Sequence, residues 1–155
     1  MNIKLVLKLV GRVLLIETAA LTVPLAAALI YRESPLPFLL TIAIMAVCGL
    51  ALSSLPAKQQ FFAREGFVAV GLIWIFTGLA GALPFIFSGC FATPMDAVFE
   101  SCSGFTTTGS TILTDIEALP KGILFWRAFT HWLGGMGVLV LATAIVPKLG
   151  IRSHY

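Results

Sequence analysis

Four long apolar stretches dominate the pattern of hydrophobic and polar positions along the chain. They cover residues 13–31, 38–55, 67–87 and 122–146. Each stretch is long enough to cross a hydrocarbon layer of about 30 Å as a helix, and a helix satisfies its backbone polar groups internally. The pattern therefore predicts an all-α integral membrane protein with four transmembrane helices.

The connection between the last two apolar stretches contains a fifth, shorter helical pattern. Thr93 suits a helix N-cap, Pro94 suits the first helical position, and Asp96 stands where a capping box needs an acceptor. These signals predict a helix over about residues 94–105. At roughly 18 Å such a helix is too short to cross a bilayer. We therefore expect a re-entrant pore helix.

The run that follows this helix carries the candidate cation chemistry. Its residues are Thr106, Thr107, Thr108, Gly109 and Ser110. Non-helical backbone at membrane depth is tolerated only where protein buries it or where it lines a water-filled path. Backbone carbonyls there can replace the hydration shell of a cation, and the glycine allows a backbone conformation closed to other residues. The run thus predicts a filter strand over residues 106–110, with a plain polar turn as the alternative.

The predicted elements divide the chain into two parts. Residues 1–60 form an N-terminal pair of transmembrane helices, and residues 61–155 form one helix–pore–helix repeat. One such repeat supplies one quarter of a ring around an ion. The chain contains no second copy, so three readings stay open: a portion of a larger transporter, a homotetrameric cation channel built from four copies, and an inactive truncated fragment.

Composition supports the interpretation as a membrane protein and excludes soluble and nucleic-acid-binding proteins. The 155 residues are 59% hydrophobic and 11% charged, against about 25% charged residues in soluble domains. The net charge of +3 comes from basic residues that form no phosphate-tracking stripe, so the lipid bilayer and not a nucleic acid is the expected partner. The three cysteines form no metal-binding spacing and are expected to be buried.

The distribution of basic residues predicts the orientation. With both termini cytoplasmic, the inner side holds most of them: Lys4, Lys8, Arg12, Lys58, Arg64, Lys148 and Arg152. The outer side then holds only Arg32, Lys121 and Arg127. This asymmetry favours cytoplasmic N- and C-termini.

Two charged positions inside apolar stretches need partners. Arg127 is expected to pair with Glu100 and support the filter, and snorkelling to the outer interface is the alternative. Glu17 is expected to pair structurally, with Arg12 close in sequence, or to lie at the interface. No enzyme is predicted, because Ser103 and His131 give only weak support for a serine hydrolase.

Gly134, Gly135 and Gly137 lie in the last apolar stretch. They are expected to allow close packing of that helix, with a gating hinge as the alternative.

Three sequence runs together resemble the Trk-type potassium uptake proteins, namely their membrane subunits of the TrkH/TrkG kind. Residues 99–111 read FESCSGFTTTGST, residues 125–127 read FWR, and residues 132–137 read WLGGMG. The resemblance extends over essentially the whole chain. It implies two additional N-terminal helices followed by the first of four repeats, and it identifies Gly109 as the filter glycine of that repeat.

The resemblance also implies a function and partners. It implies potassium uptake across the bacterial inner (cytoplasmic) membrane by a multi-pass protein, with K⁺ as the transported ligand and no cofactor in this chain. It further implies a homodimer and a cytosolic nucleotide-binding regulator, TrkA. The chain departs from the family at His131, where glutamine is expected. It also stops after one repeat.

Overall fold

The computed structural model describes residues 3–57 and 63–145, and within these ranges it contains seven α-helices and no β-strand. The helices are α1 (Ile3–Ala20), α2 (Thr22–Ile30), α3 (Leu36–Ser53), α4 (Ala63–Gly81), α5 (Leu83–Ser88), α6 (Pro94–Phe105) and α7 (Lys121–Ile145). The segment expected as a filter strand, residues 106–110, has turn and irregular backbone.

Four of the described segments are long and apolar enough to cross a membrane. They are Ile3–Ile30, Leu36–Ser53, Gly66–Ser88 and Lys121–Val140. The prediction of an all-helical protein with four such segments is confirmed. The first begins ten residues earlier than the apolar stretch at 13–31 predicts, because the isolated basic residues Lys4, Lys8 and Arg12 do not interrupt the helix.

Two of these segments contain a break next to a proline. The first divides at Leu21 into α1 and α2, three residues before Pro24, and the third divides at Ala82 into α4 and α5, two residues before Pro84. Proline lacks a backbone N–H and its ring clashes with the carbonyl four residues earlier. Each break is therefore a local consequence of sequence.

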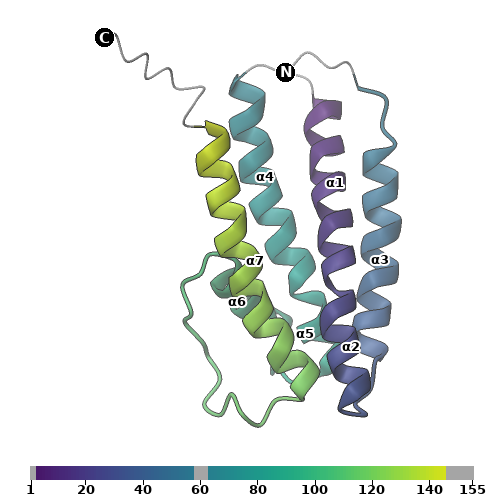
Figure 1. Cartoon of the computed structure of the whole chain (residues 1–155), viewed down its shortest axis with the longest axis vertical. Coiled ribbons are helices and arrows are strands. Elements are labelled where there is room, and N and C mark those ends of the chain that lie inside the picture. The colour runs from purple at the N-terminus through teal and green to yellow at the C-terminus, as the bar shows by residue number, and fades with distance from the viewer. Residues whose placement is uncertain (1–2, 58–62, 146–155) are drawn as a thin grey trace.

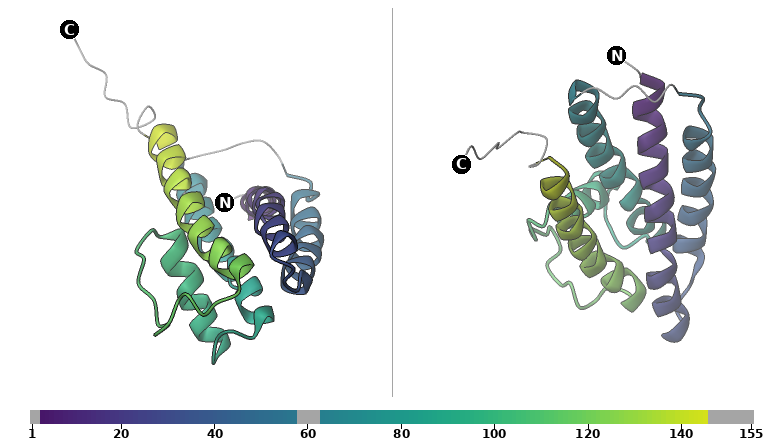
Figure 2. Two further views of the ribbon diagram at one scale, coloured as in Figure 1. Left: turned by 60° about the horizontal axis from the view of Figure 1, so that its bottom comes forward. Right: turned by 45° about the horizontal axis from the view of Figure 1, so that its top comes forward.

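The long helices lie side by side as a bundle (Figures 1 and 2). The first residues of α1 and the last residues of α7 lie at one end, and the α2–α3 connection lies at the opposite end (Figure 1). The boundary at 60/61 and the basic residues Lys58, Lys148 and Arg152 lie outside the described residues. Orientation in the membrane remains a prediction.

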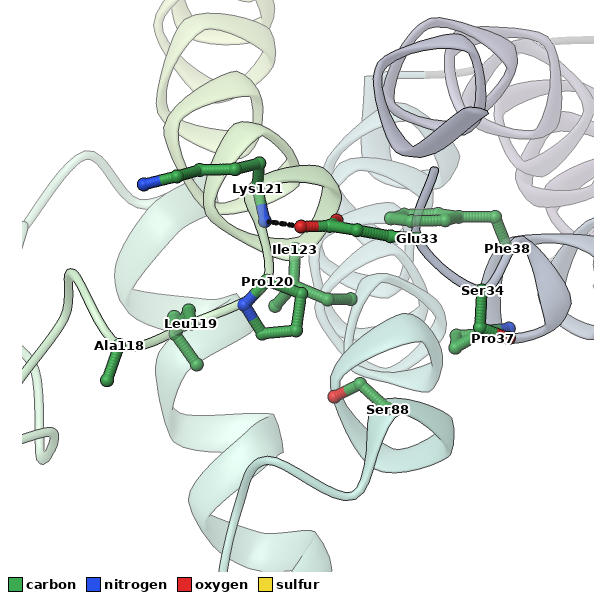
Figure 3. Close-up of a pocket in the computed structure, with 10 residues that line it drawn as sticks. All are labelled: Glu33, Ser34, Pro37, Phe38, Ser88, Ala118, Leu119, Pro120, Lys121 and Ile123. Carbon is green, nitrogen blue, oxygen red and sulfur yellow. Dashed lines mark hydrogen bonds between the residues drawn. The ribbon is translucent and has the colours of Figure 1, made fainter. Parts of the chain in front are cut away.

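A carboxylate from the α2–α3 connection caps α7. Glu33 accepts hydrogen bonds from the backbone N–H groups of Lys121 at 2.6 Å and Gly122 at 2.8 Å. These are the first two residues of α7, whose N–H groups have no partner inside the helix. Figure 3 shows Glu33 beside Lys121 in a cavity of about 510 Å³ that Ser88 and Leu119 also line. The contact joins the N-terminal helix pair to α7.

The expected burial of the cysteines is wrong for two of the three. Cys48 and Cys102 are exposed, and Cys90 is half-buried. Cys48 lies on α3 and Cys102 on α6, and the Cys102 sulfur is 3.0 Å from the position of a β-carbon on Gly78 of α4.

Candidate functional site

The helix that precedes the candidate cation segment has the predicted bounds and the predicted cap. The Thr93 hydroxyl accepts the Asp96 N–H at 3.2 Å, and the Asp96 carboxylate accepts the Thr93 N–H at 3.0 Å. This reciprocal capping box satisfies two backbone donors that the helix itself cannot. Pro94 occupies the first turn. The helix α6 therefore begins where local sequence places its start.

Buried hydrogen bonds and a close backbone contact fix α6 between α4 and α7. Ser101 of α6 donates its hydroxyl to the Gly78 carbonyl of α4 at 2.7 Å, and Trp126 of α7 donates its indole N–H to the Gly81 carbonyl of α4 at 2.9 Å, which joins the two helices on either side of α6. On the other side, a β-carbon on Gly134 would overlap the backbone of Phe105. The end of α6 thus packs against the middle of α7. Figure 1 shows the chain returning from there to the start of α7.

The second residue after the end of α6 has a left-handed backbone conformation although it is not glycine. Thr107 has φ 58°. Its N–H donates to the Gly104 carbonyl at 2.9 Å, and the Thr108 N–H donates to the Ser103 carbonyl at 3.0 Å. This pair of bonds is a Schellman motif, which usually has glycine at the left-handed position. A β-branched residue there is strained, and such strain concentrates at functional sites.

The segment just after α6 presents carbonyl oxygens without protein partners. Within the described residues, the carbonyls of Thr106, Thr107, Thr108 and Gly109 accept no hydrogen bond. All four residues are exposed. Gly109 has φ 78°, a conformation that suits glycine. The segment is therefore a run of exposed residues whose backbone carbonyls have no hydrogen-bond donor in the described part of the chain.

Side chains of α6 hold the far end of this segment. Ser103 donates its hydroxyl to the Ser110 carbonyl at 2.6 Å. Thr111 donates its hydroxyl to Oε2 of Glu100 at 2.9 Å. The Ser110 carbonyl, expected among the cation ligands, thus already accepts one hydrogen bond. Ser103 was a candidate nucleophile in the sequence, and its hydroxyl is directed to this backbone.

Glu100 also carries the ion pair expected from the sequence. Arg127 Nε lies 2.5 Å from Glu100 Oε1. The glutamate side chain is 1% exposed and the arginine side chain 15%. Both carboxylate oxygens are therefore satisfied, one by α7 and one by Thr111. The expected role of this pair as a support of the filter remains a proposal.

His131 lies beside Gly109, a placement that sequence reasoning did not foresee. Its Nδ1 is 2.9 Å from the Arg127 carbonyl, and because a carbonyl only accepts, Nδ1 carries the proton in this contact. Its Nε2 lies 3.8 Å from the position of a β-carbon on Gly109. The departure from the expected glutamine was the one signal in the sequence that pointed to this position.

The three glycines of the WLGGMG run differ in their surroundings. A β-carbon on Gly134 would overlap backbone atoms of Phe105. On Gly135 and Gly137 it would meet only side-chain atoms at 3.9 Å, an ordinary contact. Close packing is thus required at the first glycine alone.

Glu17 does not have the surroundings expected from the sequence. Its side chain is 4% exposed, and neither carboxylate oxygen has a hydrogen-bond partner in the described part of the chain. Arg12, the expected partner, is exposed. The expected pairing with Arg12 is therefore wrong, because Glu17 faces the interior of the bundle.

Comparisons with known proteins agree with the resemblance. A family model described as cation transport protein, TrkH, matches residues 37–155. The chain is 41% identical over 155 residues to the Trk system potassium uptake protein TrkH of Escherichia coli strain K12 and 39% identical over 156 residues to that of Halomonas elongata. It is 34% identical over 154 residues to the potassium uptake protein TrkG of Escherichia coli.

These alignments cover 97% of the chain and 32% of each relative. The chain therefore spans about a third of the length of the curated relatives that it matches.

Proposed function

Because this chain belongs to the TrkH family of cation transport proteins, we propose that it takes part in potassium uptake across the bacterial cytoplasmic membrane. Its contribution is one quarter of a carbonyl-lined selectivity filter. The matched relatives are named potassium uptake proteins. In this proposal α6 is the re-entrant pore helix and residues 106–110 are the filter segment.

The observation that carries the proposal is the run of carbonyls on Thr106, Thr107, Thr108 and Gly109 that accept no hydrogen bond from the residues the structure describes. Hard monovalent cations take oxygen ligands, and a filter must replace the hydration shell without binding the ion too tightly to release it. Neutral carbonyls meet both needs. The left-handed conformations of Thr107 and Gly109 set the direction of the backbone on either side of Thr108.

The electrostatics near the filter also suit a cation. The C-terminal end of α6, with its partial negative charge, lies directly before the segment. The nearby charges Glu100 and Arg127 neutralise each other in an ion pair. The pair therefore positions Thr111 without adding net charge beside the ion path.

A single repeat does not surround an ion, so the other three quarters come from elsewhere. We propose that they come from further repeats of a larger transporter, because the matched relatives are about three times as long as this chain. The cytoplasmic termini, the homodimer and the TrkA regulator implied by the family resemblance belong to the same proposal. The exposed face of residues 106–110 is where the other repeats would lie.

Rubidium uptake tests the filter proposal. The whole protein that contains this chain is expressed in cells lacking potassium uptake, and Gly109→Ser is compared with Gly89→Ser. Both glycines have positive φ, 78° and 68° respectively, so both substitutions introduce similar backbone strain. Neither substitution introduces a steric clash at the β-carbon. The nearest described atom would be 3.8 Å away at Gly109, and no described atom lies within 4 Å at Gly89.

The expected result is loss of rubidium uptake or of its preference over sodium in Gly109→Ser, with near-normal uptake in Gly89→Ser. Equal effects of the two substitutions, at equal amounts of protein in the membrane, would contradict a filter role for Gly109.

A further inference from the structure

Glu17 lies where three helices meet. A β-carbon on Gly81 of α4 would be 3.2 Å from Glu17 Oε1. The same position is 2.8 Å from the Ser101 hydroxyl oxygen and overlaps the Phe105 ring, both on α6. The Glu17 carboxyl group therefore lies beside Gly81, the glycine of α4 against which α6 packs. It is next to α6 itself and not at residues 106–110.

No positive charge in the described residues faces this carboxyl group. The helices α2, α3 and α5 contain no charged residue, and neither does α4 from Gly66 to its end. On α6, Glu100 is paired with Arg127 of α7, and Asp96 is engaged in the capping box. On α1 itself, the basic residues Lys4, Lys8 and Arg12 all precede Glu17 by more than one turn, and Arg12, the nearest of them along the chain, is exposed.

No hydrogen-bond donor of the described segments reaches the carboxyl group either. Among residues 3–57 and 63–145, both Glu17 oxygens lack a hydrogen-bond partner, and so does the buried hydroxyl of Thr77, one turn before Gly81 on α4. The nearby Ser101 hydroxyl is committed to the Gly78 carbonyl. An ionised carboxylate buried without a partner costs several kcal/mol, whereas a neutral acid avoids the charge term of that cost. Ionisable residues inside a membrane segment are otherwise a sign of function.

We propose that Glu17 is a proton-binding site inside the membrane segment, with a single proton on its carboxyl group as the ligand. The site is built by α1, α4 and α6. Loss of this proton places a full negative charge beside Gly81 and Ser101, which hold α6. Protonation of Glu17 therefore acts on the helix that precedes the cation segment. The site does not depend on the filter proposal, because it rests on different residues.

Glu100 is a built-in control for this proposal. It is as buried as Glu17, at 1% against 4% exposure, and it is also on a helix of the same bundle. Its oxygens, however, accept hydrogen bonds from Arg127 and Thr111. If burial alone decided whether a carboxyl group binds a proton, both residues would be protonated. The proposal instead predicts a protonated acid at Glu17 and a carboxylate paired with Arg127 at Glu100.

Infrared spectroscopy of the whole protein in lipid vesicles gives the decisive test. A protonated carboxylic acid shows a carbonyl-stretch band that a carboxylate lacks. We expect this band in the wild-type protein and its loss in Glu17→Gln, a neutral variant of the same shape that preserves the packing. Identical spectra of the two proteins in the acid carbonyl region, at equal melting temperature, would overturn the proposal.

Dicyclohexylcarbodiimide then locates the acid. The acid proton moves to a carbodiimide nitrogen, the carboxyl oxygen bonds to the central carbon, and migration of the acyl group to nitrogen leaves a stable N-acylurea. We expect mass spectrometry to find the adduct at Glu17, to find none at Glu100, and to find a smaller yield as pH rises. An adduct at Glu100 with none at Glu17 would also overturn the proposal.

Discussion

Arg127 on α7 donates its Nε–H to Oε1 of Glu100 on α6, and the two atoms are 2.5 Å apart. The other oxygen of this carboxylate accepts the Thr111 hydroxyl. A single buried side chain thus joins two helices and the end of the segment with free carbonyls. This arrangement supplies the first test of how the filter is held.

Arg127→Gln should lower the stability of the protein strongly. It leaves the Glu100 carboxylate, 1% exposed, without its counter-charge, and removing one partner of a buried ion pair costs about 3–5 kcal/mol. Thermal unfolding in lipid vesicles measures this loss. Adding Glu100→Gln should recover part of it, because neither position of the former pair then carries a charge. A double variant that loses the sum of both single effects would contradict the coupling.

Ser103→Ala should change ion selectivity more than Ser101→Ala. Each substitution removes one hydroxyl donor from α6, at a cost of about 0.5–1.5 kcal/mol. The Ser103 hydroxyl binds the Ser110 carbonyl at 2.6 Å, but the Ser101 hydroxyl binds the Gly78 carbonyl on α4 at 2.7 Å. The rubidium-to-sodium uptake ratio of the whole protein measures the difference. Equal ratios in the two variants would show that Ser103 does not shape the filter.

Gly134→Ala should destabilise the protein much more than Gly135→Ala or Gly137→Ala. The added methyl group at Gly134 would overlap the backbone of Phe105, while at the other two positions the nearest atoms are 3.9 Å away. Overpacking costs about 1–3 kcal/mol, and the rigid backbone of α6 favours the upper end. Membrane yield and melting temperature provide the measurement. Equal tolerance at all three positions would argue against close packing at Gly134.

Glu33→Gln should loosen the start of α7. The substitution removes the negative charge that accepts the N–H groups of Lys121 and Gly122, and loss of a helix cap costs about 0.5–2 kcal/mol. Hydrogen exchange should become faster at these two amides. Glu117→Gln is the matched control, because Glu117 is exposed. Unchanged exchange at Lys121 and Gly122 would show that the cap is not needed.

The four apolar helical segments and the bounds of α6 were predictable because they depend on local sequence. An apolar run long enough to cross a membrane needs only its own residues to form a helix. The start of α6 depends on Thr93, Pro94 and Asp96, which lie within four positions of one another. The pairing of Glu100 with Arg127 was also predictable from the sequence, because each of these charged residues has few other possible partners among apolar neighbours.

The sequence by itself thus determined which segments are helices, where α6 begins, and which residues could offer carbonyls to a cation. Tertiary structure alone decided that Ser103 binds Ser110, that Glu33 caps α7, that His131 lies beside Gly109, and that Glu17 has no partner in the described part of the chain. The physical reason is distance along the chain. Whether a buried polar group finds a partner depends on how closely packed helices approach one another, and the glycines Gly81 and Gly134 set those approaches only once the helices are assembled.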